Sequence, residues 1–166
     1  MSTTHTTTPS SLGPLTLVAT DGTLSGLYPP GHRRMPGLAA LGAREDAVFG
    51  PVVEQLQEYF AGQRTEFSLP LRLDGTPFQQ RVWRDLTAVP YGQTRSYAQV
   101  AAPYGTGHEV LRAIGAAIAA NPVLIIVPCH RVVAADGSLK GYAAGLERKR
   151  QLLEHEGALI TPARMF

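Results

Sequence analysis

The single cysteine of this 166-residue chain, Cys129, lies between Pro128 and His130 in the segment VPCHRVV at residues 127–133. A thiolate is a strong nucleophile, and a histidine close by can accept the proton that the thiol must lose. The segment therefore indicates that Cys129 is a nucleophile. The alternative is structural, since a buried free cysteine commonly serves as a small apolar side chain.

The bulk composition limits the possible functions. One cysteine excludes an internal disulfide and a multi-cysteine zinc cluster, and 44% apolar with 17% charged residues is typical of a folded domain. The longest apolar run, residues 123–127, has the length of a strand and is too short to cross a bilayer. The first residues carry no secretion-signal pattern, so we expect a cytoplasmic protein without membrane contact. The net charge of +2 suits a nucleic-acid-binding face and an ordinary surface equally well.

The first part of the chain predicts a small α/β domain over residues 12–74, preceded by a flexible tail. Residues 1–11 are rich in Thr and Ser, as loose termini often are. Residues 15–19 and 24–27 predict two strands, and the Asp21-Gly22 turn between them favours an antiparallel hairpin. Residues 29–43, with several Gly and Pro, predict a loop.

One helix should complete this domain. Apolar residues recur with helical spacing from position 49 to position 60, and Gly50-Pro51 marks the start of the helix or a kink in it. Residues 67–71 predict an edge strand or an extended linker. The apolar positions of the helix are Phe49, Val52, Val53, Leu56 and Phe60.

Residues 75–166 predict a mostly helical domain. Thr76 and Ser96 are each followed three residues later by Gln, which is the pattern of a capping box at the start of a helix. A third helix follows the glycines around residue 106. Three short helices separated by turns are typical of a helix-turn-helix domain. Asp136-Gly137 favours a hairpin that would serve as a wing. Helices are expected at about residues 77–86, 97–102, 108–120 and 146–156.

The third of these helices has one face of unusually small residues. At 100° per residue, Leu111, Ile114 and Ile118 share a face that should pack on the core. The opposite face offers mostly methyl groups and one long side chain, Arg112, which suits entry into a minor groove about 6 Å wide better than base reading in a major groove. The alternative is an alanine-rich helix packed between neighbours. The opposite face consists of Arg112, Ala113, Ala116, Ala119 and Ala120.

Seven segments, in order, resemble the O6-alkylguanine-DNA alkyltransferases, also called methylated-DNA–protein-cysteine methyltransferases. Together they cover about residues 66–158, and their combination is specific to that family. The first domain resembles the family only loosely, in its hairpin, its helix and the sequence YFAG at 59–62. The segments are PFQQRVW at 77–83, PYGQTRSY at 90–97, RAIG at 112–115, NP at 121–122, PCHRV at 128–132, GY at 141–142 and LLEHEG at 152–157.

The resemblance implies an α+β fold, with a small N-terminal ribonuclease H-like α/β domain followed by a mostly helical, winged-helix-like (helix-turn-helix) C-terminal domain. It implies binding of double-stranded DNA that contains alkylated guanine, flipping of the damaged base, and irreversible transfer of its alkyl group to Cys129. No cofactor and no metal would be needed. We expect a monomer, and we leave open whether it binds cooperatively along DNA or also acts on O4-alkylthymine.

The resemblance also assigns roles by motif position. Cys129 would accept the alkyl group, His130 would act as its base through a bridging water, and Glu156 would orient His130. Asn121 would brace the thiol segment, and Tyr97 would place its phenol at the base pocket. The implied DNA-binding residues are Arg112, which would fill the vacated base stack, with Ala113, Ala116, Ser96 and Thr94. The implied substrate pocket consists of Tyr142, Ala143, Val132 and Ile118.

The chemistry explains why such residues are needed. An unperturbed cysteine with a pKa near 8.5 is only a few per cent thiolate at pH 7, so a base must take its proton. Adjacent side chains rarely point the same way, so a water relay or an irregular backbone at Pro128 is expected between Cys129 and His130. Guaninate leaves poorly unless Tyr97 or backbone N–H groups stabilise it. A thioether is not hydrolysed, which predicts one turnover per molecule.

Three alternatives remain at this point. A non-enzymatic relative could hold alkylated DNA, a winged-helix regulator could use a redox cysteine, and a Cys-His hydrolase would turn over repeatedly. The chain also departs from the family, which often has small residues at Val110 and Leu111, and Ser or Gly at Ala143 and Ala144. These positions leave the pocket width and the contact with DNA undecided.

Overall fold

The structure is a computed structural model that describes residues 1–159. The chain divides into two compact units, one made of Met1–Asp74 with Pro122–Leu124, the other of Gly75–Asn121 with the residues from Ile125 onward. A sheet dominates the first unit and helices dominate the second, which confirms the expected α+β class. No helix among the described residues is long and apolar enough to span a membrane.

The sheet of the first unit has the strand order β3-β2-β1-β4. Strands β2 (Leu15–Thr20) and β3 (Thr23–Tyr28) pair antiparallel and confirm the predicted hairpin. Asp21 and Gly22 both have positive φ, 49° and 82°. This is the backbone of a type I′ turn, whose twist matches that of the flanking strands.

The prediction of a flexible tail at residues 1–11 was wrong. Thr3–Thr8 form strand β1, which pairs antiparallel with β2 over its whole length. Threonine is β-branched and favours strands, and the alternate residues Thr6 and Thr8 are buried. The Thr-rich composition was taken as a sign of disorder, but these residues form a strand with one buried face.

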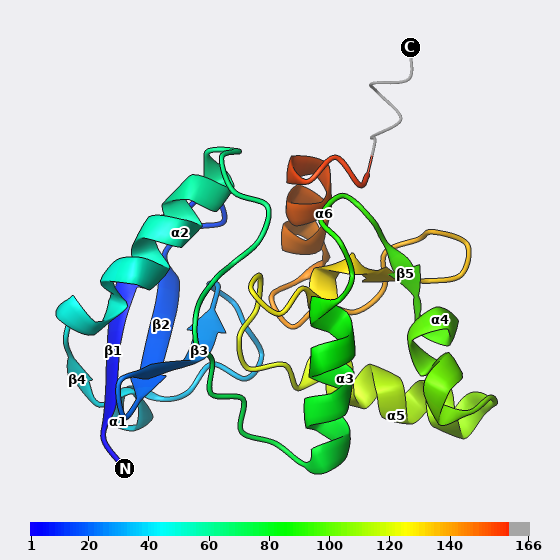
Figure 1. Cartoon of the computed structure of the whole chain (residues 1–166), viewed down its shortest axis with the longest axis horizontal. Helices are drawn as coiled ribbons and strands as arrows, with labels where there is room; N and C mark the ends of the chain where they lie inside the picture. The colour runs from blue at the N-terminus through cyan, green and yellow to red at the C-terminus, as the bar shows by residue number, and fades with distance from the viewer. Residues whose placement is uncertain (160–166) are drawn as a thin grey trace. The chain divides into compact units, whose positions relative to one another are not determined.

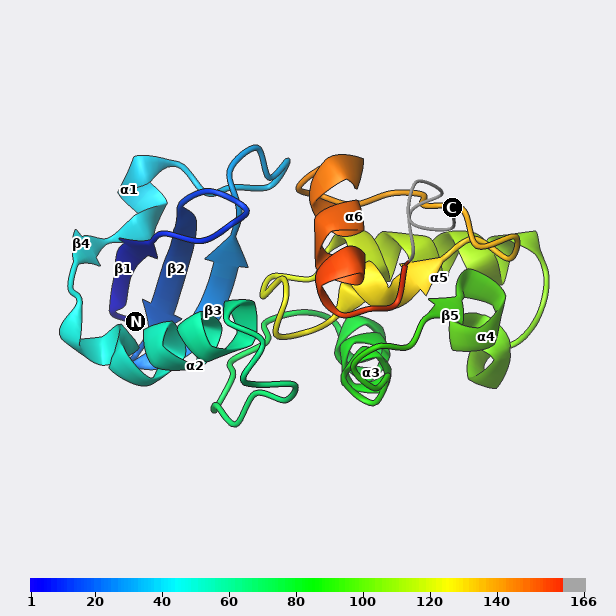
Figure 2. The ribbon, with the colours of Figure 1, turned by 90° about the horizontal axis from the view of Figure 1, so that it is seen from above.

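Two short elements and one longer helix complete the first unit. Residues 29–43 were expected to be loop only, but they contain α1 (Leu38–Leu41) and the start of β4 (Ala43–Arg44), which pairs parallel with β1. After η1 (Ala47–Phe49), helix α2 (Gly50–Phe60) lies across one face of the sheet (Figures 1 and 2). Its buried residues are Val52, Leu56 and Tyr59.

The edge of β3 carries two further chain segments. Leu71 makes a single parallel bridge to Leu24, so residues 67–71 are mainly the extended linker that we gave as one of two possibilities. On the same strand, Leu27 N–H donates to Pro122 O, and Leu124 N–H donates to Leu27 O. Three residues from the later part of the chain therefore belong to the sheet unit.

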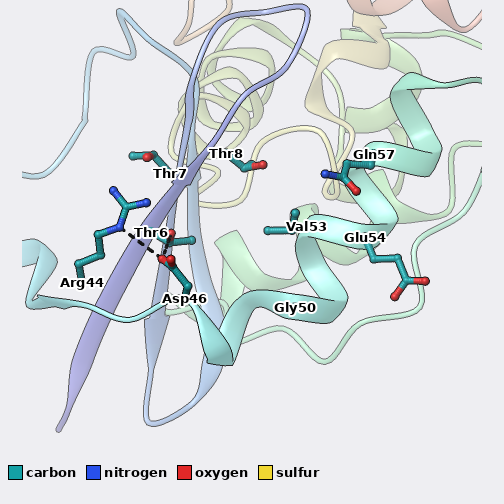
Figure 3. A pocket seen from close by; sticks show the side chains of 9 residues that line it. All are labelled: Thr6, Thr7, Thr8, Arg44, Asp46, Gly50, Val53, Glu54 and Gln57. Carbon is teal, nitrogen blue, oxygen red and sulfur yellow. Dashed lines mark hydrogen bonds and ion pairs between the residues drawn. The ribbon is translucent and has the colours of Figure 1, made fainter.

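An open hollow of about 350 Å³ lies between β1 and α2 (Figure 3). The Thr6 hydroxyl and Arg44 Nε both donate to one carboxylate oxygen of Asp46, at 2.6 and 3.3 Å. The hydrogen bond from Thr6, followed by the charge of Arg44, holds the pKa of Asp46 below its usual value. No residue predicted for the functional site lines this hollow.

The second unit begins with the predicted helices. Both capping boxes are present, so Thr76 starts α3 (Pro77–Thr87) and Ser96 starts α4 (Tyr97–Ala101). After η2 (Ala102–Tyr104) comes α5 (His108–Ala119), and α6 (Leu146–His155) is the last described helix. The buried Trp83 indole donates to Ala117 O at 2.8 Å and joins α3 to α5.

A two-stranded parallel sheet joins distant parts of this unit. Strand β5 (Arg95–Ser96) pairs with β6 (Val132–Val133), which directly follows the 3₁₀ turn η3 (Cys129–Arg131). The expected wing hairpin is only a turn, closed by Ala134 N–H donating to Ser138 O, without a returning strand. Asp136 accepts from the N–H and the hydroxyl of Ser138, which explains the turn without any strand pairing.

Candidate active site

The backbone before Cys129 is irregular. The apolar run at 123–127 has strand length, yet it forms a buried turn in which Ile125 has a φ of 72°. A β-branched residue is strained in that left-handed region. Pro128, at φ −83° and ψ 61°, then makes an inverse γ-turn, in which Cys129 N–H donates to Val127 O at 2.8 Å. The Asn121 amide donates to the same carbonyl at 2.8 Å, so this residue braces the segment before the thiol.

Cys129 is only 5% exposed. Burial raises the pKa of its thiol to about 11, while a hydrogen bond from Asn121 and the charge of Lys149 act in the opposite direction. Because such a thiol is protonated at neutral pH, attack by the sulfur requires a proton acceptor close to it. The neighbouring imidazole can supply one.

His130 is fully buried, and its Nε2 lies 2.8 Å from Glu156 Oε2. Burial lowers the pKa of His130, so the ring is neutral, even though the hydrogen bond with Glu156 opposes this shift. A carboxylate only accepts, so Nε2 carries the proton and Nδ1 has the free lone pair. Nδ1 is buried and has no hydrogen-bond partner among the described residues. This nitrogen is therefore able to accept a proton.

A buried arginine fixes the carboxylate on the other side. Arg131 Nε donates to Glu156 Oε1 at 2.8 Å, and its Nη2 donates to Oε2 at 3.1 Å. The remaining Nη1 donates to Val89 O at 2.7 Å, and the guanidinium lies 5.8 Å from the centre of the Tyr91 ring. The bidentate pair balances the charge of Glu156, which a buried carboxylate requires.

Lys149 is a second buried cation, only 1% exposed. Its Nζ donates to Lys140 O at 2.9 Å and to Gly141 O at 3.1 Å, and it lies 5.9 Å from the centre of the Tyr97 ring. Burial lowers the pKa of Lys149 to about 8, while the nearby thiolate raises it. A positive charge at this position stabilises the anionic form of Cys129.

The residues predicted for the catalytic group and the pocket fall in this same unit. The Tyr97 hydroxyl donates to Lys140 O at 2.7 Å, and burial, followed by the Cys129 charge, raises the pKa of Tyr97. Tyr97 follows β5 and Val132 starts β6, so strand pairing brings both near η3. Of the predicted pocket residues, Val132, Tyr142 and Ile118 are buried, whereas Ala143 is partly exposed.

Helix α5 presents the expected small surface. Ile114, Ala117 and Ile118 are buried, while Arg112, Ala113, Ala116 and Ala119 are exposed. The expectation that Leu111 packs on the core was wrong, since 37% of this residue is exposed. It lies in the first turns of the helix, where His108 and Glu109 are exposed as well. The core face of α5 therefore begins at Ile114.

Two predicted DNA-binding residues also have structural tasks. The Ser96 hydroxyl accepts from Gln99 N–H and caps α4, which leaves its own proton free to donate. Thr94 is partly exposed, and its carbonyl accepts from Arg95 Nη1 at 2.9 Å. Capping does not exclude contact with a phosphate.

Sequence reasoning missed Arg131 and Lys149 as members of the site. A signal existed for Lys149, because it lies three and four residues before the buried Leu152 and Leu153, on the apolar stripe of α6. Arg131 lies between His130 and two valines, within a segment that is buried throughout. A charged residue in an apolar stripe indicates a buried partner.

Comparisons with known proteins identify the family. Residues 4–73 match the ribonuclease-like domain of 6-O-methylguanine DNA methyltransferase, and residues 77–158 match its DNA binding domain. A methylated-DNA–protein-cysteine methyltransferase of Mycobacterium bovis is 44% identical over 153 residues, which is 89% of this chain and 88% of the relative. The chain belongs to this family.

Solved structures of the 6-O-methylguanine DNA methyltransferase family have the same fold. The Mycobacterium tuberculosis O6-methylguanine methyltransferase shares 43% identity over 96% of both chains, with a TM-score of 0.83. A structure of the M. tuberculosis protein in complex with DNA is 44% identical, covers 94% of this chain and 93% of that chain, and has a TM-score of 0.82. The resemblance found in the sequence is therefore confirmed. Among residues 1–159, no group of three or more His, Cys, Asp or Glu is placed to hold a metal ion.

Proposed function

We propose that this protein repairs double-stranded DNA by transferring the alkyl group of O6-alkylguanine to Cys129, once per molecule. The observation that carries the proposal is the buried His130, next in sequence to the only cysteine: Arg131 holds Glu156, Glu156 holds His130 Nε2, and His130 Nδ1 has no hydrogen-bond partner among the described residues. Membership of the 6-O-methylguanine DNA methyltransferase family supports the substrate class.

In the proposed reaction, sulfur attacks the alkyl carbon, the S–C bond forms and the bond between carbon and guanine O6 breaks. The thiol proton passes through a water to His130 Nδ1, whose opposite nitrogen already donates to Glu156. Guanine takes up one proton as it leaves, and the proton held by His130 then returns through solvent to the donor of that proton, so no net charge is left on the protein. Tyr97 is the proposed donor, which requires its hydroxyl to leave Lys140 O when the base enters.

Two side chains support stabilisation of the sulfur anion. Asn121 and Lys149 both lower the pKa of Cys129 against the effect of burial. Lys149 is held by two carbonyl groups, so its charge needs little rearrangement during the reaction. The product is a thioether, which water does not cleave, and this predicts a stoichiometric reaction without a cofactor.

DNA would bind through α5, in the minor groove. Its exposed face carries small residues, Ala113 and Ala116 among them, which favours close approach to a narrow groove, and Arg112 is the long side chain beside them that would fill the space of an extruded base. Ser96 and Thr94 would contact phosphates. We expect the protein to be cytoplasmic, since its single cysteine needs no oxidising compartment. We also expect it to act as a monomer.

The experiment that tests the proposal is the mass of the intact protein after mixing with a duplex that contains O6-methylguanine. We expect a gain of one methyl group on Cys129, limited to one equivalent. Tight binding without a mass change would favour a non-enzymatic DNA-binding relative, and product beyond one equivalent would favour a hydrolase. Footprints at one sequence of undamaged DNA would favour a transcription regulator.

Replacing Arg112 with Ala should slow repair in duplex DNA by about 10- to 100-fold, because extrusion of a base costs a few kcal/mol that the arginine would offset. Reaction with free O6-alkylguanine should change by less than about twofold, since that substrate needs no extrusion. Single-turnover rates with both substrates measure the difference. Arg44→Ala, an exposed arginine in the other unit, is the control. Equal losses with both substrates would remove the extrusion role.

A further inference from the structure

The chain turns sharply at residues 90–93, between α3 and β5. Gln93 N–H donates to Pro90 O at 3.1 Å, and Gly92 has a φ of 82°. A glycine with positive φ at the third position of such a turn is typical of type II. Tyr91 occupies the second position, so the turn fixes the place from which its side chain leaves the backbone.

This turn lies against Arg131, the last member of a relay in which His130 is held by Glu156 and Glu156 by Arg131. Directly before the turn, Val89 O accepts from Arg131 Nη1 at 2.7 Å. The guanidinium lies 5.8 Å from the centre of the Tyr91 ring, within the range of a cation–π contact. Arg131 is therefore held by Glu156 on one side and by the segment 89–91 on the other.

The turn also reaches the end of α6 that carries the carboxylate. The Tyr91 hydroxyl donates to His155 O, but at 3.5 Å this hydrogen bond is weak. A Cβ built on Gly92 would lie 3.4 Å from Glu156 O, so the backbone of the turn passes close to the end of the helix. The stronger of the two contacts of the Tyr91 side chain is thus the one between its ring and the cation.

The position of Arg131 matters for the base of the relay. Burial lowers the pKa of His130, the Glu156 carboxylate raises it, and the charges of Arg131 and Lys149 lower it. Arg131 donates to both oxygens of Glu156, so it offsets the negative charge that would otherwise favour a protonated ring. If the guanidinium moved away, the imidazole would keep a proton up to a higher pH and could not accept one from the thiol.

We propose that Tyr91 is a positioning residue of the alkyl transfer, because its ring holds the Arg131 guanidinium on Glu156 and so keeps His130 able to accept the thiol proton. The inference rests on the proposed function and adds to it a residue that acts through others. An aromatic face suits this task, since a guanidinium can lie over it while its N–H groups go on donating to Glu156 and Val89.

The test is the pH dependence of the single-turnover rate of Tyr91→Leu, measured with a methylated duplex from about pH 5 to about pH 9. Leucine keeps an apolar side chain but offers the guanidinium no aromatic face. We expect the acid limb of the profile to move up by about one pH unit, because the pKa of His130 rises. The rate should therefore fall about tenfold at the acidic end and stay within about twofold of the wild type at the alkaline end.

Other groups near the relay do not imitate this shift. Burial, followed by the charge of Glu156, raises the pKa of Tyr91, so its hydroxyl stays protonated over this range. The thiol of Cys129, with a pKa of about 11, also stays protonated. Lys149, with a pKa of about 8, titrates within the range, but it does so in both proteins, and the ratio of their rates removes its effect.

Tyr91→Phe is the matched variant, since it keeps the ring and removes only the long hydrogen bond to His155 O. Its rate should stay within about twofold of the wild type at every pH. Tyr104→Leu is the control. Arg81 lies 5.0 Å from the centre of the Tyr104 ring, so this variant also removes a contact between an arginine and a tyrosine, at a place outside the relay. Its acid limb should coincide with that of the wild type.

Single-turnover rate constants describe only the molecules that react, so a partly unfolded variant does not distort the profile. Tyr91→Met is a second apolar replacement should Tyr91→Leu not fold. A leucine or methionine variant with the acid limb of the wild type, even at a uniformly lower rate, would overturn the inference and leave the proposed function intact. An equal shift in Tyr91→Phe would also overturn it, because the hydroxyl would then hold the relay. Failure of the wild type to take up any methyl group would instead overturn the proposed function itself.

Discussion

Replacing Cys129 with serine is expected to abolish alkyl transfer while leaving affinity for methylated duplex within about twofold of the wild type. A serine hydroxyl has a much higher pKa than a thiol and is a poor nucleophile toward saturated carbon. Cys129 is only 5% exposed, whereas the exposed face of α5 carries the proposed DNA contacts. Intact mass measures the transfer, and a mobility-shift titration measures the affinity.

The melting temperature of Cys129→Ser serves as the control for folding, because the new hydroxyl is buried beside Asn121. Any methyl uptake by the variant would show that another residue is the acceptor. Loss of DNA binding together with transfer, in a variant that melts normally, would contradict the separation between the reacting thiol and the DNA-binding surface.

Glu156→Gln should produce the second largest effect, a fall in the single-turnover rate of about 100-fold or more. The carboxylate now accepts from both His130 and Arg131. An amide that accepts from Arg131 would turn its NH₂ group toward His130, so the ring would have to carry its proton on Nδ1 and could not accept one from the thiol. The buried arginine–carboxylate pair would also lose its charge balance, at a cost of about 3 kcal/mol in the free energy of unfolding.

Single-turnover kinetics and chemical denaturation, both at a temperature where the variant is folded, separate the two effects. Glu147→Gln is the matched control, because this acid lies on the same helix with 76% of its side chain exposed and should alter neither quantity. A Glu156→Gln variant that loses stability but transfers the alkyl group at the normal rate would reduce Glu156 to a structural role.

Much of the second unit could be predicted from local sequence signals. The capping boxes at Thr76 and Ser96 depend on contacts within one helical turn, and both are formed. The hairpin of β2 and β3 in the first unit could also be predicted from a local signal, because Asp21 and Gly22 adopt the turn backbone that an Asp-Gly pair favours. Cys129 and His130 could be selected because their chemistry is visible in the residue types alone.

The remaining features depend on contacts between distant residues. Arg131 meets Val89 and Glu156 across 42 and 25 positions, so no local pattern indicates its partners. Leu111 has the periodicity of a core residue but lies near the start of α5, where 37% of it stays exposed. Strand β1 was missed because the polarity of its threonines was taken as a sign of a loose tail, although threonine favours strands. Pairing with β2, which lies further along the chain, makes this segment a strand.

The three residues Pro122–Leu124 bear on how this protein could be divided in evolution or in the laboratory. They lie within the stretch that matches the DNA binding domain, yet they hydrogen-bond to Leu27 in the sheet unit and directly precede the segment that carries the thiol. A gene split at residue 74 would sever these backbone pairings from their partner strand. The sheet unit is therefore complete only with residues 122–124 from the later part of the chain, and a fragment that ends at residue 74 lacks them.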